Sequence, residues 1–135
     1  MEYSRLIAAA AAARDKSYAP YSQFAVGAAL QTKSGEVYAG CNVENLSFGL
    51  TLCAERNAVA AAVSNGSRDF VAVAIVTDSK QPAVPCGACR QVLSEFNPRL
   101  KVVSATISGQ VQEFDLNALL PFPDQGISLR QRRDV

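Results

Sequence analysis

Three cysteines that begin two predicted helices constrain this sequence more than any other feature. Cys86 and Cys89 stand one helical turn apart in PCGACRQVL, and Cys53 opens the apolar stretch CAERNAVAAAVS. The N-terminus of a helix carries partial positive charge, which favours the ionised form of a thiol placed there. If the three thiolates converge, they can bind Zn²⁺ and leave its fourth tetrahedral position open, as in catalytic zinc sites. The spacing therefore predicts a zinc site with room for a water molecule.

The same cysteines allow two other interpretations. A C-x2-C pair at the start of a helix could be a redox couple, although that interpretation leaves Cys53 without a role. Cys41, twelve residues before Cys53 in a predicted strand, could close the site with a fourth thiolate and make it purely structural. Cys41 would fit equally well as a small buried apolar residue. We favour the open site and keep both alternatives.

The composition excludes several classes of protein. The chain has 135 residues and no histidine, so no imidazole can act as a base or a ligand. Its formal net charge of +1 offers no basic surface for nucleic acid or for an anionic membrane. The N-terminal sequence lacks the features of a secretory signal, and no stretch is apolar for long enough to span a membrane. We therefore expect a cytoplasmic protein without nucleic-acid or membrane partners, in a compartment where thiols stay reduced.

The order of predicted elements indicates a single domain over residues 1–135. FVAVAIVT, residues 70–77, lacks polar alternation and so predicts a strand buried on both faces. The order of helices and strands implies a three-layer α/β/α sandwich around one mixed central sheet of about five strands. The final stretch RQRRDV has no apolar pattern, and residues from about 124 to 135 are expected to form a flexible tail. The other elements are expected as helices over 2–16, 53–66, 86–97 and 115–121, a hairpin over 26–43, and strands over 101–107 and 111–114.

Charged residues follow the cysteines closely. Glu55 comes two residues after Cys53, where a carboxylate could take a proton from an activated water and return it to a leaving group. A zinc ion with three thiolates carries a formal charge of about −1, which weakens its pull on a bound water. Arg56 or Arg90, each in the first turn after a cysteine, could compensate for this charge, and we favour Arg56. The plainer alternatives are that Glu55 only stabilises its helix through a negative charge at the N-terminus, and that Arg90 is simply exposed to solvent.

The cysteine and glutamate motifs resemble those of a known enzyme family. C-A-E followed later by P-C-x-x-C is similar to the signature of zinc-dependent nucleoside and nucleobase deaminases, with cysteine where many members have histidine. Three longer stretches resemble the small homotetrameric cytidine deaminases, and the likeness extends from the first predicted helix to about Pro121. These stretches are APYSQFAVGAAL at 19–30, GCNVENLSFGLTLCAERNA at 40–58 and PCGACRQVLSEF at 85–96.

The resemblance implies a reaction and a cofactor. Members of this family hydrolyse cytidine and deoxycytidine to uridine and deoxyuridine with release of ammonia, in pyrimidine salvage. One zinc ion per chain would be held by Cys53, Cys86 and Cys89, and a zinc-bound hydroxide would attack C4 of the pyrimidine. Glu55 would act as the catalytic proton shuttle to N3 and to the leaving amino group.

The resemblance also implies residues that bind the substrate. Asn42 and Glu44 match positions that bind the sugar hydroxyls. They are two residues apart at the end of a strand, and residues with this spacing face the same side. Phe24 matches an aromatic wall beside the base and ribose. The backbone of Ala54 would bind the edge of the pyrimidine, and Arg56 would neutralise the ligand thiolates.

Family members assemble as homotetramers, so some contacts are expected from neighbouring subunits. Phe48 and Gly49 fall in the loop that would reach a neighbouring site. Phe122 is in the place of an aromatic residue that closes over the base, but it comes sooner after Pro121 than the family pattern predicts.

Three alternative functions fit these residues less well than cytidine deamination does. A deaminase of another pyrimidine-like compound, such as a blasticidin-type antibiotic, would not need the ribose-binding pair Asn42 and Glu44. Action on cytosine within RNA or DNA would need a basic groove that the composition does not provide. A zinc module used only for assembly would have no use for the carboxylate of Glu55.

Overall fold

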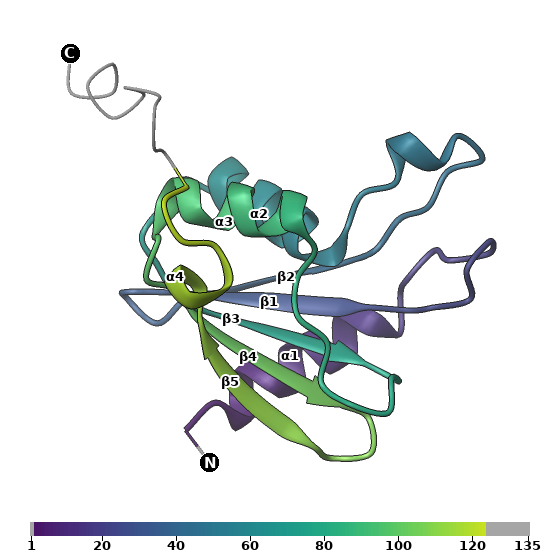
Figure 1. Ribbon diagram of the computed structural model, residues 1–135, viewed down its shortest axis with the longest axis horizontal. Coiled ribbons are helices and arrows are strands. Elements are labelled where there is room, and N and C mark those ends of the chain that lie inside the picture. Colours follow the sequence, from purple (N-terminus) through teal and green to yellow (C-terminus); the bar gives the residue numbers. More distant parts are fainter. Residues whose placement is uncertain (1, 124–135) are drawn as a thin grey trace.

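The computed structural model describes residues 2–123, and its centre is one mixed β-sheet (Figure 1). The strand order is β2-β1-β3-β4-β5, in which β3 and β4 are parallel and the other neighbours are antiparallel. The prediction of a mixed sheet of five strands is therefore confirmed. The strands are β1 (Gly27–Thr32), β2 (Val37–Cys41), β3 (Phe70–Thr77), β4 (Lys101–Thr106) and β5 (Val111–Asp115).

Helices cover both faces of the sheet, which confirms the predicted three layers (Figure 1). Helix α1 (Ser4–Arg14) packs on one face, and α2 (Ala54–Ser64) and α3 (Gly87–Phe96) pack on the other. The short helix α4 (Leu116–Leu119) follows β5. Each face has its own apolar core, because side chains alternate between the faces along a strand. The α1 core includes Leu6, Ala10, Ala29, Ala74 and Val76, and the opposite core includes Leu30, Ala58, Val73, Leu93 and Val102.

Two glycines let the helices approach the sheet closely. A Cβ atom at Gly40 in β2 would lie 2.5 Å from the backbone nitrogen of Ala58 in α2, and one at Gly27 in β1 would lie 1.9 Å from the carbonyl oxygen of Ala10 in α1. Real Cβ atoms do not approach backbone atoms so closely, so both positions require glycine for this packing. The contact at Gly40 fixes α2 against β2, next to the residues that follow β2.

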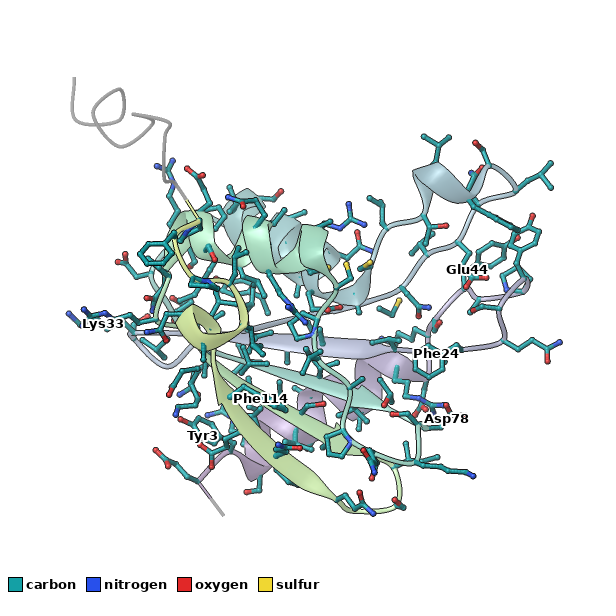
Figure 2. The ribbon with its side chains drawn as sticks, in the orientation of Figure 1. Tyr3, Phe24, Lys33, Glu44, Asp78 and Phe114 are labelled. Carbon is teal, nitrogen blue, oxygen red and sulfur yellow. The ribbon has the colours of Figure 1, made fainter. Side chains whose placement is uncertain are left out.

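Two long segments extend from one end of the sheet, between α1 and β1 and between β2 and α2 (Figure 1). A β-bridge between Tyr18 and Val43 joins the two segments outside the main sheet, and a second bridge, between Val43 and Leu52, lies within the later segment. The second segment contains a 3₁₀ helix, η1 (Phe48–Leu50). Figure 2 labels Phe24 and Glu44 in this region. The two segments thus bring residues of separate sequence motifs to the same end of the sheet.

In the part of the chain that the structure describes, no helix has the length and apolar character needed to cross a membrane. The predicted tail over 124–135 lies outside the described residues.

Candidate active site

The three predicted cysteines meet where α2 and α3 begin. Cys53 immediately precedes α2, Cys86 immediately precedes α3, and Cys89 is buried in the first turn of α3. Their sulfur atoms all lie within 4.8 Å of one another, and those of Cys53 and Cys86 are 3.9 Å apart. Figure 2 shows sulfur atoms gathered beside the starts of the two helices. Among residues 2–123, this is the group of side chains that could hold a metal ion, and it does not include Cys41.

The electrostatics of the sulfur atoms suit a cation. A hydrogen bond from the Cys89 thiol, together with Arg56, lowers the pKa of Cys53 to about 5. The same bond and burial raise the pKa of Cys89. Cys53 is therefore ionised at neutral pH, and Cys89 keeps the proton that the two sulfurs share. A zinc ion among three sulfurs would replace this proton, so the donor set fits Zn²⁺ with three thiolates.

The two candidate arginines have different surroundings. The Nη2 atom of Arg56 lies 3.4 Å from the Cys53 sulfur and also donates to the carbonyl of Thr51. Arg90 instead donates to the carbonyl oxygens of Pro85 and Leu119, at 2.8 and 3.0 Å. Arg56 therefore places positive charge beside a thiolate, whereas Arg90 connects the start of α3 to the end of α4.

Glu55 is a buried carboxylic acid beside the cysteine group. It lies in the first turn of α2, is 5% exposed, and lines one cavity together with Cys53 and Cys86. Burial raises the pKa of its carboxyl group above the ordinary value for glutamate. A raised pKa makes a carboxylate a better proton acceptor, which suits a group that takes a proton from water and later returns it. The position and the chemistry of Glu55 thus suit proton transfer.

A cavity of about 270 Å³ brings the sequence candidates together. Phe24, Asn42, Glu44 and Ala54 all line it, although they come from three segments of the chain.

Sequence reasoning missed half of the residues that line this cavity. Three of the missed residues, Ser22, Val26 and Thr51, lie within the motif stretches and could have been found there. Two others come from the end of β3, which adjoins the site. The remaining two are in the loop before Cys86, and nothing in the sequence marks that loop as part of a site. The residues missed are Ser22, Val26, Thr51, Ile75, Thr77, Ala83 and Val84.

Asn42 and Glu44 also hold the walls of this cavity in place. The Asn42 amide donates to the Phe24 carbonyl at 2.8 Å, and its oxygen accepts from the Val26 N–H at 2.9 Å and from the Ser17 hydroxyl. The Glu44 carboxylate accepts hydrogen bonds from the α1–β1 segment. One of these, from the Ser22 hydroxyl, is the main reason that the pKa of Glu44 is lowered. Glu44 is therefore a fixed anion at the edge of the cavity.

The residues expected to contact a neighbouring subunit lie outside this cavity. Phe48 and Gly49 are in η1, where the Phe48 side chain is 71% exposed. The Phe48 ring makes an edge contact with Tyr21, with the ring centres 5.8 Å apart. Phe122 is 76% exposed and does not line the cavity. Within one chain, all three residues are available to a partner.

Three grouped cysteine sulfurs beside a buried glutamate, with no fourth protein ligand among the described residues, match the site of one class of enzyme, the zinc-dependent hydrolytic deaminases. The sequence matches the family model "Cytidine and deoxycytidylate deaminase zinc-binding region" over residues 1–106. The chain therefore belongs to the cytidine and deoxycytidylate deaminase family.

Individual relatives support this assignment. The chain is similar to cytidine deaminase from Halalkalibacterium halodurans, with 51% identity over 122 residues that cover 90% of this chain and 92% of the relative. It is 47% identical to cytidine deaminase from Sporosarcina psychrophila, with 90% of each chain covered. The crystal structure of cytidine deaminase from Burkholderia pseudomallei superposes with a TM-score of 0.86 at 51% identity, covering 90% of this chain and 98% of that one.

Proposed function

We propose that this protein hydrolyses cytidine and deoxycytidine to uridine and deoxyuridine and releases ammonia. The observation that carries the proposal is the group of three cysteine sulfurs, all within 4.8 Å of one another. Two of these cysteines, Cys53 and Cys86, line a cavity that Glu55 also lines. The cytidine deaminases from Halalkalibacterium halodurans and Burkholderia pseudomallei are each 51% identical to this chain and cover 90% of it. This similarity supports the same reaction.

The three cysteines, Glu55 and Arg56 have separate parts in this reaction. Cys53, Cys86 and Cys89 would hold one zinc ion, which would supply the Lewis acid chemistry that activates water for attack on C4 of the cytosine. Glu55 would take one proton of that water and pass it to the pyrimidine N3. It would then take the second proton from the oxygen that has added to C4 and pass it to the amino group, which leaves as ammonia. Arg56 offsets the negative charge of the thiolates.

The opposite side of the cavity binds the nucleoside. Phe24 lies against the base and the ribose, and the backbone of Ala54 binds the edge of the pyrimidine. The Glu44 carboxylate accepts a hydrogen bond from a sugar hydroxyl. Asn42 has one amide hydrogen that is not used by Phe24, and it donates this hydrogen to the sugar.

A turnover assay with metal analysis on the same sample tests the proposal. The zinc-loaded protein is expected to convert cytidine to uridine, and the free base cytosine and blasticidin S are expected to be far poorer substrates because the cavity has groups for a ribose. A zinc-replete sample that forms no uridine would contradict the proposal. Faster turnover of the antibiotic than of cytidine would assign the site to a different deaminase.

The active form is proposed to be a homotetramer in which neighbouring chains complete the sites. The segment from Val43 to Leu52 exposes several large apolar side chains, and such a patch on a folded chain indicates a contact surface. Phe48, Gly49 and Phe122 are the residues expected at these contacts. Sedimentation velocity at micromolar concentration measures the assembly, and a monomeric active enzyme would be the contrary result. The exposed apolar residues are Val43, Leu46, Phe48, Leu50 and Leu52.

We place this reaction in pyrimidine salvage in the cytoplasm. The four cysteines of the chain are all unpaired, which is typical of a reducing compartment. Cell fractionation tests this location, and recovery of the protein outside the cytoplasm would contradict it.

A further inference from the structure

Ser22 lies between the substrate cavity and a second cavity, and its hydroxyl contacts two residues that are proposed to bind the nucleoside. It lines both cavities, which have volumes of about 270 and 260 Å³. Its Oγ donates a hydrogen bond to the Glu44 carboxylate and accepts one from the backbone N–H of Phe24. We infer that Ser22 is a positioning residue that orients the Glu44 carboxylate toward the sugar and holds Phe24 beside it. This inference rests on the proposed function.

The hydrogen bonds of Glu44 explain why a single hydroxyl has this effect. Oε1 accepts from the backbone N–H groups of Tyr21 and Ser22, at 2.9 and 3.1 Å, and these bonds occupy both of its lone pairs. Oε2 accepts from the Ser22 hydroxyl and keeps one lone pair. The oxygen that can still accept a sugar hydroxyl is therefore the one that Ser22 holds. Without this hydroxyl, Oε2 would lose its hydrogen-bond partner among the described residues.

The turn that carries Ser22 contains a strained residue. Gln23 has a φ of 58°, in the left-handed region that residues other than glycine rarely adopt. Two hydrogen bonds of 3.0 Å hold this turn, from the Gln23 N–H to the Ala19 carbonyl and from the Phe24 N–H to the Ser22 Oγ. The Ser22 hydroxyl therefore stabilises the strained turn and fixes the position of Phe24 relative to Glu44.

Ser22 acts at the sugar end of the cavity and not at the cysteine group. Within residues 2–123, its side chain bonds to Glu44 and Phe24 and to neither the cysteines nor Glu55. Loss of the hydroxyl should therefore weaken binding of the substrate and of the transition state equally, which raises KM and leaves kcat unchanged. Partial unfolding would instead reduce the active fraction, and so lower kcat at constant KM.

The experiment compares Ser22→Ala with the zinc-loaded wild type on cytidine and on 2′,3′-dideoxycytidine, which lacks the sugar hydroxyls that Glu44 would bind. We expect KM for cytidine to rise about tenfold, with kcat within about twofold. The KM for dideoxycytidine should change much less. Ser22→Thr keeps the hydroxyl and should restore KM for cytidine. Ser34→Ala is the matched control, because the Ser34 hydroxyl also donates to a glutamate, Glu36, at the far end of β1.

The possible outcomes separate the role of Ser22 from the proposed function. An unchanged KM for cytidine in Ser22→Ala would overturn the inference. An equal rise in KM for both substrates would also overturn it, because Ser22 would then shape the turn without acting through Glu44. Zinc content and thermal unfolding of the variant establish that its fold is intact. A wild type that does not deaminate cytidine overturns both proposals, whereas an active wild type with an unaffected variant overturns only this one.

Discussion

Replacing Glu55 with glutamine is expected to lower kcat for cytidine by about 10²-fold to 10⁴-fold, the usual contribution of one proton-transfer group. Glutamine has nearly the same shape as glutamate, so the buried position in the first turn of α2 should accept it. Its amide cannot take a proton from water at neutral pH, nor return one to the leaving group. Initial-rate kinetics on the zinc-loaded variant measure the loss directly.

The zinc content of the same variant distinguishes catalysis from structure. Glu55 is not one of the grouped sulfur ligands, so Glu55→Gln should keep one zinc per chain and unfold at a temperature close to that of the wild type. Glu36→Gln, at the exposed turn between β1 and β2 and far from the cysteines, is the control and should retain full turnover. A Glu55→Gln enzyme with normal kcat would show that the proton shuttle is a different group.

The elements of the fold that sequence reasoning predicts well are those with local causes. FVAVAIVT is apolar except for its last residue, and β3 occupies the same eight residues, Phe70–Thr77. All of them except Val71 are buried, as expected of a central strand that is covered on both faces. The starts of α2 and α3 fall directly after Cys53 and Cys86. In each case the pattern along the chain is sufficient, and no distant contact has to be known.

The elements that the sequence did not reveal depend on contacts between distant segments. The bridges that join Val43 to Tyr18 and Leu52 follow no alternating pattern, because each bridge joins a single pair of residues. Ala83 and Val84 line the cavity because the loop from β3 to α3 passes over it, and small apolar residues in a loop carry no signal of their own. Ser22 is similar, since its role depends on a carboxylate 22 residues further along the chain.

The candidate metal ligands occupy an intermediate position between these two cases. The sequence predicts which thiols are placed at helix starts, but it cannot decide between an open site and one that Cys41 closes. That decision requires the packing of α2 against β2. Gly40 allows this close contact, and the sulfur group that results contains Cys53 but not the neighbouring Cys41.

Replacing Cys89 with serine is expected to abolish stable zinc binding and, with it, deamination. Cys89 is fully buried, and its sulfur is one of the three that meet. A serine hydroxyl does not ionise at neutral pH and is shorter than a thiol, so two thiolates would remain where zinc normally has at least three protein ligands. Metal analysis after dialysis against a weak chelator should give one zinc per wild-type chain and much less than one per variant chain.

Thermal unfolding provides a second measurement of the same effect, because a metal that binds only the folded chain stabilises it, by about 4 kcal/mol at a thousand times its Kd. The unfolding temperature of the wild type should rise with added zinc and fall with chelator, whereas Cys89→Ser should respond to neither. Cys41→Ser is the matched control and should retain its zinc, its thermal response and its turnover, because Cys41 lies outside the sulfur group. Loss of zinc from the Cys41 variant would mean that four thiolates surround the ion. No coordination position would then remain for water, and the site could not support hydrolysis.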